Sequence, residues 1–596
     1  MDKKTIAKRV GALRDYMRQH HLAAFIFPST DPHNGEYVPE HWAARKWISG
    51  FDGSAGTAVV TLTEAALWTD SRYFLAAEEQ LAGTDYLLMK EGLPGTPTIA
   101  QWLCRMLKAG DTVGLDGWVN SVASVEHLRQ ALKPAGLSID TSLDPTLELW
   151  NNRAGLPLTP VEVHPLKYAG EDTTSKFTRL RAQMTALGAN MTIICPLDEI
   201  AWITNLRGHD MPYNPVFVSY LTITHDSATL FIDPNKLSDE VEDYLHSQGI
   251  GTLPYDALTA TLASTKPGTL LIDPQACNCQ VLPPDDKGWT IVRHTSIVAP
   301  MKAIKNKAEQ EGFRQAMLRD GVALVKFMRW LKPAVEAGKE TELSVDKRLT
   351  ALRAKQALYR DNSFGTIAAY AQHGAIVHYE ANKESNLPLE PHGLLLLDSG
   401  AQYQDGTTDI TRTIPLGPLT QEERMDYTLV LKGHIRLATA KFPVGTCGTQ
   451  LDVLARYAMW QHGINYMHGT GHGVGSYLCV HEGPHQIRMN HMPTPLMPGM
   501  TVTNEPGIYR AGKHGVRIEN TMMVTEYADG PFGRFLQLEP LTLCPIDMEP
   551  ILWDMMQLDE IDYLNDYHAH VREALAPLLR GKDLEWLMEA TETYYL

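Results

Sequence analysis

The sequence predicts two repeated α/β units followed by a region of different character. Segments that begin at Trp47 and Trp202 each contain Trp-Ile, a small polar turn, a β-branched run and a hairpin that ends in an acidic turn at Asp70 or Asp233. Each segment follows a helical pattern and a short apolar strand. Strands that alternate with helices are typical of α/β units. The similarity of two segments about 155 residues apart indicates a duplication.

The first unit is expected to open with an amphipathic helix, because apolar residues recur there at helical spacing, namely Ile6, Val10, Leu13 and Met17. Short apolar strands are expected at 23–27 and, in the second unit, at 191–195. Linkers are expected at 151–170, which is rich in Pro and Gly, and at 294–305.

From Lys305 the pattern changes. Residues 305–338 predict a long amphipathic helix, with apolar side chains such as Phe313, Leu324 and Phe327 on one side. Strands and glycine turns follow to about Glu526. The chain is again helical from residue 551, and the apolar face of this last segment needs a partner in the same subunit or in another one.

Composition and charge exclude several classes of protein. A chain of 596 residues is too long to fold around one hydrophobic core, so several domains are expected. Its 44% hydrophobic and 21% charged residues are those of an ordinary globular protein. The formal net charge of −17 disfavours nucleic acids and anionic membranes as partners, because both require a basic surface.

The predicted location is the cytoplasm. The seven cysteines are scattered without a metal-binding or redox spacing, so reduced thiols are the simplest interpretation. No apolar run approaches the ~20 residues of a membrane span. The run from Leu22 to Pro28 is too short and too late for the apolar region of a signal peptide.

Residues 468–485, HGTGHGVGSYLCVHEGPH, contain four histidines and five glycines. Glycine allows the backbone to approach a ligand closely, and histidine is the commonest metal ligand and a proton carrier. A phosphate loop is the weaker interpretation, because neither GxGxxG nor GxxxxGK[ST] is present. The GxSxG elbow of a serine hydrolase and the HExxH zinc motif are also missing. The segment therefore indicates one metal ligand with proton donors around it.

Two pairs of acids flank this segment. Asp398 ends a run of four leucines, and Asp409 opens the next β-rich run. Facing side chains of paired strands lie ~5 Å apart, so these acids are predicted to share one space. Glu505 and Glu519 repeat the arrangement on the carboxyl-terminal side. Taken singly, either aspartate is better interpreted as a solvated turn residue and either glutamate as one half of a surface ion pair. Two acid-bearing hairpins that flank a segment of glycines and histidines are much harder to explain by chance.

Charge favours two metal ions. Four converging carboxylates carry −4, which one divalent cation would leave at −2 and two would balance. Paired ions can hold a hydroxide between them. Mostly oxygen ligands with one histidine suit Mn²⁺, while Zn²⁺ and Co²⁺ remain alternatives on ligand type.

The acids and histidines resemble the ligand set of the pita-bread metallopeptidases, which include methionine aminopeptidase, prolidase and Xaa-Pro aminopeptidase. Over nearly the whole chain, SGFDGSAGTAVVT, DEIAWITNLRG, GAIVHYEA and EPLTLCPID look like the long, three-domain Xaa-Pro aminopeptidase of cytosolic type. The resemblance implies a fold of α/β and α+β class. Two creatinase-N-like α/β domains, 1–155 and 156–303, would precede a pita-bread catalytic domain at 304–535 and its helical extension at 536–596.

The resemblance also implies the roles of individual residues. Asp409 and Glu519 would bridge two metals, and the remaining metal ligands would be Asp398, His472 and Glu505. Glu505 would also take the proton from the nucleophilic water. His378 and His481 would act in catalysis and contact substrate and tetrahedral intermediate. His468 would line the proline side, and Arg517 would pair with the carboxylates and help to hold substrate.

Two further histidines, His485 and His491, have no counterpart in the family pattern and are predicted to lie on the surface. The sequence departs from the family at Gln372-His373, just before His378, so substrate preference is the property this loop puts in question.

The predicted function is hydrolysis of the bond between an N-terminal residue and a penultimate proline in short peptides, by a hydroxide that bridges two divalent metals. Prolidase, which cuts X-Pro dipeptides, is the alternative enzyme, although its fold usually has one front domain. A non-catalytic pita-bread scaffold is less consistent with a complete ligand set, and creatinase lacks these ligands. The family also implies a homodimer.

Overall fold

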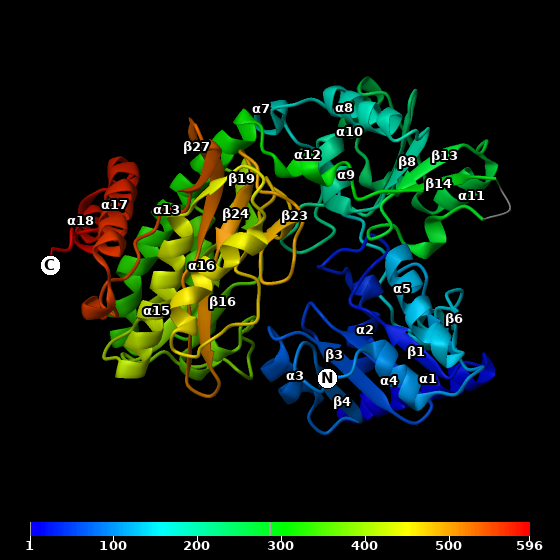
Figure 1. Cartoon of the computed structure of the whole chain (residues 1–596), viewed down its shortest axis with the longest axis horizontal. Helices are drawn as coiled ribbons and strands as arrows, with labels where there is room; N and C mark the ends of the chain where they lie inside the picture. Colours follow the sequence, from blue (N-terminus) through cyan, green and yellow to red (C-terminus); the bar gives the residue numbers. More distant parts are fainter. Residues whose placement is uncertain (1, 285–287, 596) are drawn as a thin grey trace. The chain divides into compact units, whose positions relative to one another are not determined.

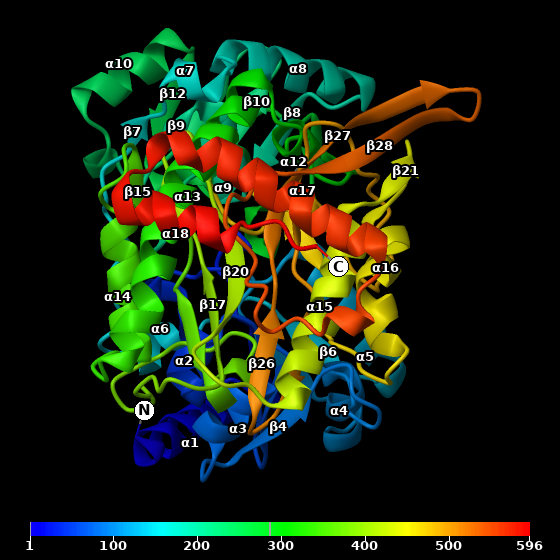
Figure 2. The ribbon, with the colours of Figure 1, turned by 90° about the vertical axis from the view of Figure 1, so that its left-hand side faces the viewer.

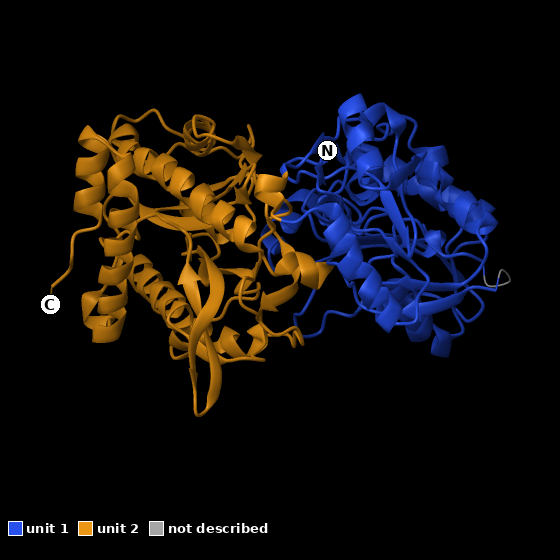
Figure 3. Ribbon diagram, turned by 90° about the horizontal axis from the view of Figure 1, so that it is seen from above, with its two compact units in different colours: residues 1–165, 171–298 blue, residues 166–170, 299–596 orange. Residues whose placement is uncertain are grey.

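A computed structural model describes residues 2–284 and 288–595 of the chain. The chain divides into two compact units (Figure 3). Unit 1 comprises residues 1–165 and 171–298, and unit 2 comprises residues 166–170 and 299–596. The predicted boundaries at 155, 303 and 535 divide the chain further and stay predictions.

Unit 1 contains two six-stranded sheets of identical design (Figure 1). The first has the strand order β4-β3-β2-β1-β5-β6 and the second β12-β11-β10-β8-β13-β14. In both, the central strand pairs antiparallel with one neighbour and parallel with the other, and both outer pairs are parallel. The duplication predicted from the repeated segments is therefore confirmed.

The strands of these sheets are short and largely buried. Those of the first are β1 Ala24–Phe27, β2 Thr57–Thr61, β3 Ala65–Thr69, β4 Tyr86–Lys90, β5 Thr112–Leu115 and β6 Ser138–Asp140. Those of the second are β8 Met191–Ile194, β10 Tyr220–Thr224, β11 Ala228–Phe231, β12 Ile250–Leu253, β13 Thr269–Ile272 and β14 Thr290–Arg293. A small pair consists of β7 Glu162–Val163 and β9 Leu206–Arg207.

Helices accompany both sheets. They are α1 Lys3–Gln19, α2 Ala44–Ser49, α3 Phe74–Leu81, α4 Ile99–Met106, α5 Val122–Leu132, α6 Thr146–Leu149, α8 Thr173–Ala186, α9 Leu197–Thr204, α10 Asp239–Ser247 and α11 Leu258–Ser264. The predicted amino-terminal helix is confirmed as α1, and its four periodic apolar residues are buried in one core with β1 and β2.

Unit 2 is built on long helices around small antiparallel sheets (Figure 2). The helices are α7 Leu166–Ala169, α12 Ala299–Ala303, α13 Lys307–Glu336, α14 Glu342–Arg353, α15 Gln421–Ala438, α16 Gly448–Trp460, α17 Leu558–Leu575 and α18 Gly581–Ala590. The predicted long helix is α13. Asn306 caps its first turn and Glu309 completes the capping box.

Two sheets of unit 2 carry the predicted acids. One is β16-β17-β20, with β16 Ile367–Tyr370, β17 Leu394–Ser399 and β20 Ile410–Pro415. The other is β21-β28-β27-β24, with β21 Lys441–Pro443, β24 Thr501–Asn504, β27 Asn520–Gly530 and β28 Gly533–Pro540. Smaller sheets contain β15 Tyr359–Asn362, β18 Ala401–Tyr403, β19 Gly406–Thr407, β22 Gly471–Gly473, β23 Glu482–Ile487, β25 Gly507–Arg510 and β26 His514–Arg517.

A single bridge between Thr411 and Glu519 joins the two larger sheets. The run of four leucines in β17 is buried on both faces, as expected of a central strand. Since β17 lies between β16 and β20, its last residues are held at a fixed position beside this bridge.

Arg412 ties the carboxyl-terminal segment to the acid-bearing strands. Its buried guanidinium donates to the carbonyl oxygens of Glu519 (2.7 Å), Cys544 (2.8 Å) and Pro545 (3.0 Å), and to the hydroxyl of Tyr567 on α17 (3.0 Å). The apolar face of α17 is buried in a core shared with α15. The partner that this face required is therefore in the same subunit.

None of the helices in the described part of the chain has both the length and the apolar character needed to span a membrane.

Candidate metal centre

Asp398 and Asp409 are brought to the same place by the pairing of β17 with β20. Asp398 lies opposite Thr411 in the antiparallel register, and Asp409 comes directly before β20. Both side chains are buried. The prediction that these two acids share one space agrees with this geometry, although two short strands, β18 and β19, intervene where a simple turn was expected.

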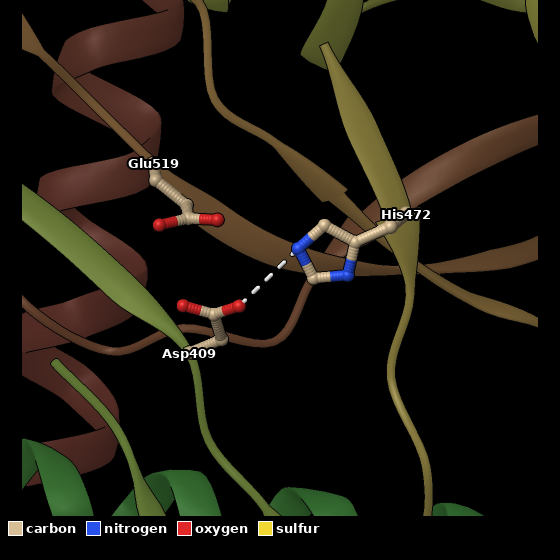
Figure 4. A group of neighbouring side chains, drawn as sticks. All are labelled: Asp409, His472 and Glu519. Atoms are coloured by element: carbon tan, nitrogen blue, oxygen red, sulfur yellow. Dashed lines mark ion pairs between the residues drawn. The ribbon is translucent and has the colours of Figure 1, made fainter. Parts of the chain in front are cut away.

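Glu519 joins them through the bridge between the sheets. Its N–H donates to the carbonyl of Thr411 (3.0 Å), and the hydroxyl of Thr411 donates to its carboxylate (2.7 Å). Glu519 comes directly before β27 and pairs with Thr411 through an isolated β-bridge. Figure 4 shows Asp409, His472 and Glu519 pointing toward one another, with one possible ligand atom from each within 4.8 Å of the others.

His472 presents one ring nitrogen to the acids. Its Nδ1 lies 2.9 Å from the carbonyl oxygen of Gly473, so the hydrogen on Nδ1 is donated there. This tautomer leaves Nε2 with its lone pair, 3.5 Å from oxygens of both Asp409 and Glu505. A backbone acceptor on the far nitrogen is the usual arrangement around a metal-binding histidine.

Burial and mutual repulsion raise the pKa of the clustered acids. Burial is the main reason that the pKa of Asp409 and of Glu505 is well above the usual range, and Glu519 adds to the repulsion in both cases. For Glu519 itself, burial and the Asp398 charge raise the pKa to about 8. Buried carboxylates that repel one another in this way are stable as anions only beside cations.

Arg517 is the protein's own cation at this site. Its guanidinium is buried and donates to Asp398 (2.7 Å), to the hydroxyl of Tyr509 (2.7 Å) and to the carbonyl of Val377 (3.3 Å). Four carboxylates and Arg517 leave a charge of −3, which is more than one divalent cation neutralises.

The donor set fits a metal ion. Within the described residues, Oδ1 of Asp398 is buried and accepts no hydrogen bond. An unpaired buried carboxylate oxygen is costly unless a cation binds it. The five predicted ligands thus border one region: Asp398 faces Arg517, and the other three acids, Asp409, Glu505 and Glu519, lie around His472.

The predicted auxiliary histidines border this region. The His481 ring stands perpendicular to that of His472, with centroids 4.4 Å apart. His468 Nε2 lies 2.8 Å from the Tyr509 hydroxyl, which also accepts from Arg517. His378 directly follows Val377, whose carbonyl accepts from Arg517.

Sequence reasoning missed Tyr509, which links His468 to Arg517. Its burial, partly offset by the Arg517 charge, raises the pKa of its hydroxyl to about 12, so it stays protonated. A tyrosine in a glycine-bearing hairpin between Glu505 and Glu519 was the available signal.

The prediction that His485 lies on the surface is wrong. Its side chain is fully buried, and Nε2 lies 2.7 Å from the carbonyl oxygen of Thr501. Burial lowers its pKa to about 4, so the ring is neutral. Its position on β23, packed against Gly473, explains the error, because the ring supports the backbone that carries His472. His491 is exposed, as predicted.

A second buried ionic cluster holds the segment that carries His481. Glu482, the next residue, is buried and binds the ammonium groups of Lys302 (2.6 Å) and Lys305. Both lysines are also buried, and burial lowers the pKa of Lys305. Sequence reasoning placed a linker at these lysines, so it missed them.

A cavity of about 580 Å³ lies elsewhere, against the first sheet of unit 1, where Ile26, Trp68 and Leu115 contribute to its lining. None of the predicted site residues lines it.

Comparison with known families defines the class of protein. The metallopeptidase family M24 matches residues 311–526, and the C-terminal region of peptidase M24 matches 534–594. Two creatinase/prolidase N-terminal domain families match 9–144 and 152–309. The fold is therefore that of an M24 metallopeptidase with a duplicated N-terminal domain.

Relatives narrow this class. The chain is 38% identical to aminopeptidase P1 of Arabidopsis thaliana, with 98% of each chain covered. It is 40% identical to a probable Xaa-Pro aminopeptidase P of Laccaria bicolor, with 97% and 92% covered. An X-prolyl aminopeptidase of Caenorhabditis elegans, described as a cytosolic enzyme with a di-nuclear active site, superimposes with a TM-score of 0.94 at 36% identity, covering 99% and 100%. The chain belongs to the aminopeptidase P family.

The raised pKa values make the effect of metal on stability depend on pH. An acid whose pKa in the folded protein exceeds its unfolded value of about 4 makes the metal-free protein less stable as the pH rises from the unfolded pKa to the folded pKa. That upper limit is about 8 for Glu519. Bound cations require the ionised acids and remove this cost. We expect Mn²⁺ to raise the thermal midpoint of chelator-stripped protein more at about pH 8 than at about pH 5.5.

The matched control is Asp409→Asn, which removes one predicted bridging carboxylate. Its thermal midpoint should respond less to Mn²⁺ at both pH values. An equal response of the original protein at the two pH values would contradict the assignment of these acids to a metal site.

Glu482→Gln tests the lysine cluster. The substitution leaves two buried ammonium groups without their counterion, so we expect the free energy of unfolding of unit 2 to fall by about 3–5 kcal/mol. Denaturant unfolding measures this change. Glu526→Gln, which removes an exposed partner of Arg534, should cost less than about 1 kcal/mol. Similar losses in both variants would mean that the cluster does not stabilise unit 2.

Proposed function

We propose that this protein is a metalloaminopeptidase that hydrolyses the bond between an N-terminal residue and a penultimate proline. The observation that carries the proposal is the meeting of Asp409, His472 and Glu519, with Asp398 and Glu505 beside them, where the two sheets join. Likeness over the whole chain to proteins named Xaa-Pro aminopeptidase supports the substrate class.

We assign two divalent ions to Asp398, Asp409, His472, Glu505 and Glu519, with Mn²⁺ as the expected metal and Zn²⁺ or Co²⁺ as alternatives. When bound, such ions would polarise a carbonyl and lower the pKa of bound water, so that hydroxide is available at neutral pH. The excess negative charge that Arg517 leaves uncompensated supports more than one ion, as does the di-nuclear site described for the nematode relative.

The chain's own groups supply the remaining chemistry. Oε1 of Glu505 lies 3.5 Å from Nε2 of His472, and a carboxylate beside bound cations is ionised, as a group that takes a proton from water must be. Proline nitrogen leaves as an amine and must gain a proton, for which His481 and His378 are the candidate donors or positioning groups. His468, held by Tyr509, would border the proline.

Recognition has to work without an amide hydrogen. The X-Pro bond is a tertiary amide, so the N–H that other peptide bonds offer to a peptidase is missing. We propose that the free amino group of the first residue is received by Asp398, whose Oδ2 is fixed by Arg517. Arg517 thereby helps to hold the substrate through the carboxylate.

The four-part division, with domains at 1–155, 156–303, 304–535 and 536–596, a homodimer and a cytoplasmic location belong to the same proposal. The nematode relative is described as cytosolic. The role of the duplicated front region would be to restrict access to short peptides or to form the dimer, since the predicted chemistry lies in unit 2.

The first experiment compares Arg-Pro-Pro with the dipeptide Ala-Pro after the protein has been stripped with chelator and reloaded with Mn²⁺. We expect metal-dependent release of arginine, measured by chromatography of the products. Cleavage of Ala-Pro alone would favour a prolidase, and no cleavage with any divalent ion would favour a scaffold.

Glu505→Gln should lower kcat on Arg-Pro-Pro by about 10²–10⁴-fold, because it removes the proposed proton acceptor. Glu526→Gln, an exposed glutamate of β27, is the control and should keep the original kcat. If the Glu505 variant retains full activity, another group must act as the base.

A further inference from the structure

The loop before His378 contains Gln372-His373, and the structure gives His373 a defined partner. His373 belongs to the short helical turn at Ala371–Ala375. Its Nδ1 lies 2.9 Å from Oε1 of Glu342, and its ring stacks on that of Tyr379 at a centroid distance of 4.3 Å. His373 therefore contacts Tyr379, the residue that directly follows His378 in the chain.

Glu342 is the centre of this arrangement. It is the first residue of α14, is fully buried, and accepts four hydrogen bonds of 2.9 Å. The donors are the backbone of Tyr370 and Leu387, the His373 ring and the Tyr379 hydroxyl. A helix N-terminus also favours a negative charge. Such complete pairing makes this carboxylate a rigid attachment point for the loop.

The loop is fixed from the opposite side by β26. A Cβ on Gly515 would lie 1.7 Å from the carbonyl oxygen of Gly374, so the two backbones touch and no side chain fits between them. Arg517, two residues after Gly515 on the same strand, donates to the carbonyl of Val377 (3.3 Å) and to Asp398 (2.7 Å).

His378 thus sits between two anchored neighbours. Val377 is held by the arginine that binds Asp398, and Tyr379 is held by Glu342 and by the ring of His373. A side chain whose backbone is fixed on both sides has few alternative positions, and a displacement of about 1 Å can lower a rate 10²-fold.

We propose that Glu342 and His373 are positioning residues that set the place of His378 against the bound X-Pro peptide. The inference rests on the proposed function. In this assignment His373 takes no part in the chemistry. It acts through the ring stack on Tyr379 and the bond to Glu342, and the loop thereby influences how tightly a substrate is held.

His373→Phe is the decisive variant, because it keeps a ring to stack on Tyr379 and loses the hydrogen bond to Glu342. We expect kcat/KM for Arg-Pro-Pro to fall about 10-fold or more, mainly through KM, because substrate binding is loosened while the metal ligands are untouched. Bound metal per chain should be unchanged. His462→Phe, an exposed histidine after α16, is the matched control and should leave KM unchanged.

A double-mutant cycle with His378→Ala separates positioning from a general effect on structure. If His373 acts through His378, adding His373→Phe to His378→Ala should change kcat/KM by less than about 2-fold. Glu342→Gln should lower kcat/KM further than His373→Phe. If that variant fails to fold, the cycle on His373 decides alone.

The outcomes are distinguishable from failure of the proposed function. If the original protein does not cleave Arg-Pro-Pro with any metal, the proposed function fails. If it cleaves the peptide and His373→Phe has the same KM, or lowers kcat/KM equally with and without His378, the positioning role is overturned and the peptidase stands.

Discussion

The burial of four like-charged carboxylates at one point is the constraint on which the rest of unit 2 depends. Asp398, Asp409, Glu505 and Glu519 come from segments far apart in the sequence, and each would avoid the others if the chain allowed it. The bridge between Thr411 and Glu519, together with the pairing of β17 and β20, removes that freedom. Arg517 offsets one of the four negative charges, so the site keeps an excess of negative charge that bound cations would neutralise.

Support for this site is layered. Arg412 donates hydrogen bonds to the backbone carbonyl of Glu519 and to those of Cys544 and Pro545 in the carboxyl-terminal segment. Lys302 and Lys305 fix Glu482, and buried His485 packs on Gly473. Glu342 accepts a hydrogen bond from Tyr379 and thereby holds the loop that contains His378. In these contacts, loss of one charged or polar partner would leave the other buried and unpaired. The geometry of the site is therefore costly to disturb.

Local patterns in the sequence predicted the parts of this structure that depend on local spacing. The helical period of Ile6 to Met17 predicted α1, the repeated Trp-Ile segments predicted the two equivalent sheets, and acids at strand ends predicted the cluster. Partners distant in sequence were missed, because nothing near Lys305 indicates Glu482 and nothing near Glu342 indicates Tyr379. His485 was misplaced because it has no counterpart in the family's site pattern, whereas its ring pairs with a buried carbonyl.

The hydrogen bond between Tyr567 and Arg412 has a consequence for the order in which the chain acquires its structure. The ribosome makes the segments that contain Asp398, Asp409 and Glu519 before it makes α17. Until Tyr567 emerges, Arg412 lacks one of its acceptors and the core beneath α17 is open. Domains generally fold as units during synthesis, so the backbone that holds the acid cluster gains its full set of contacts only after α17 has been made.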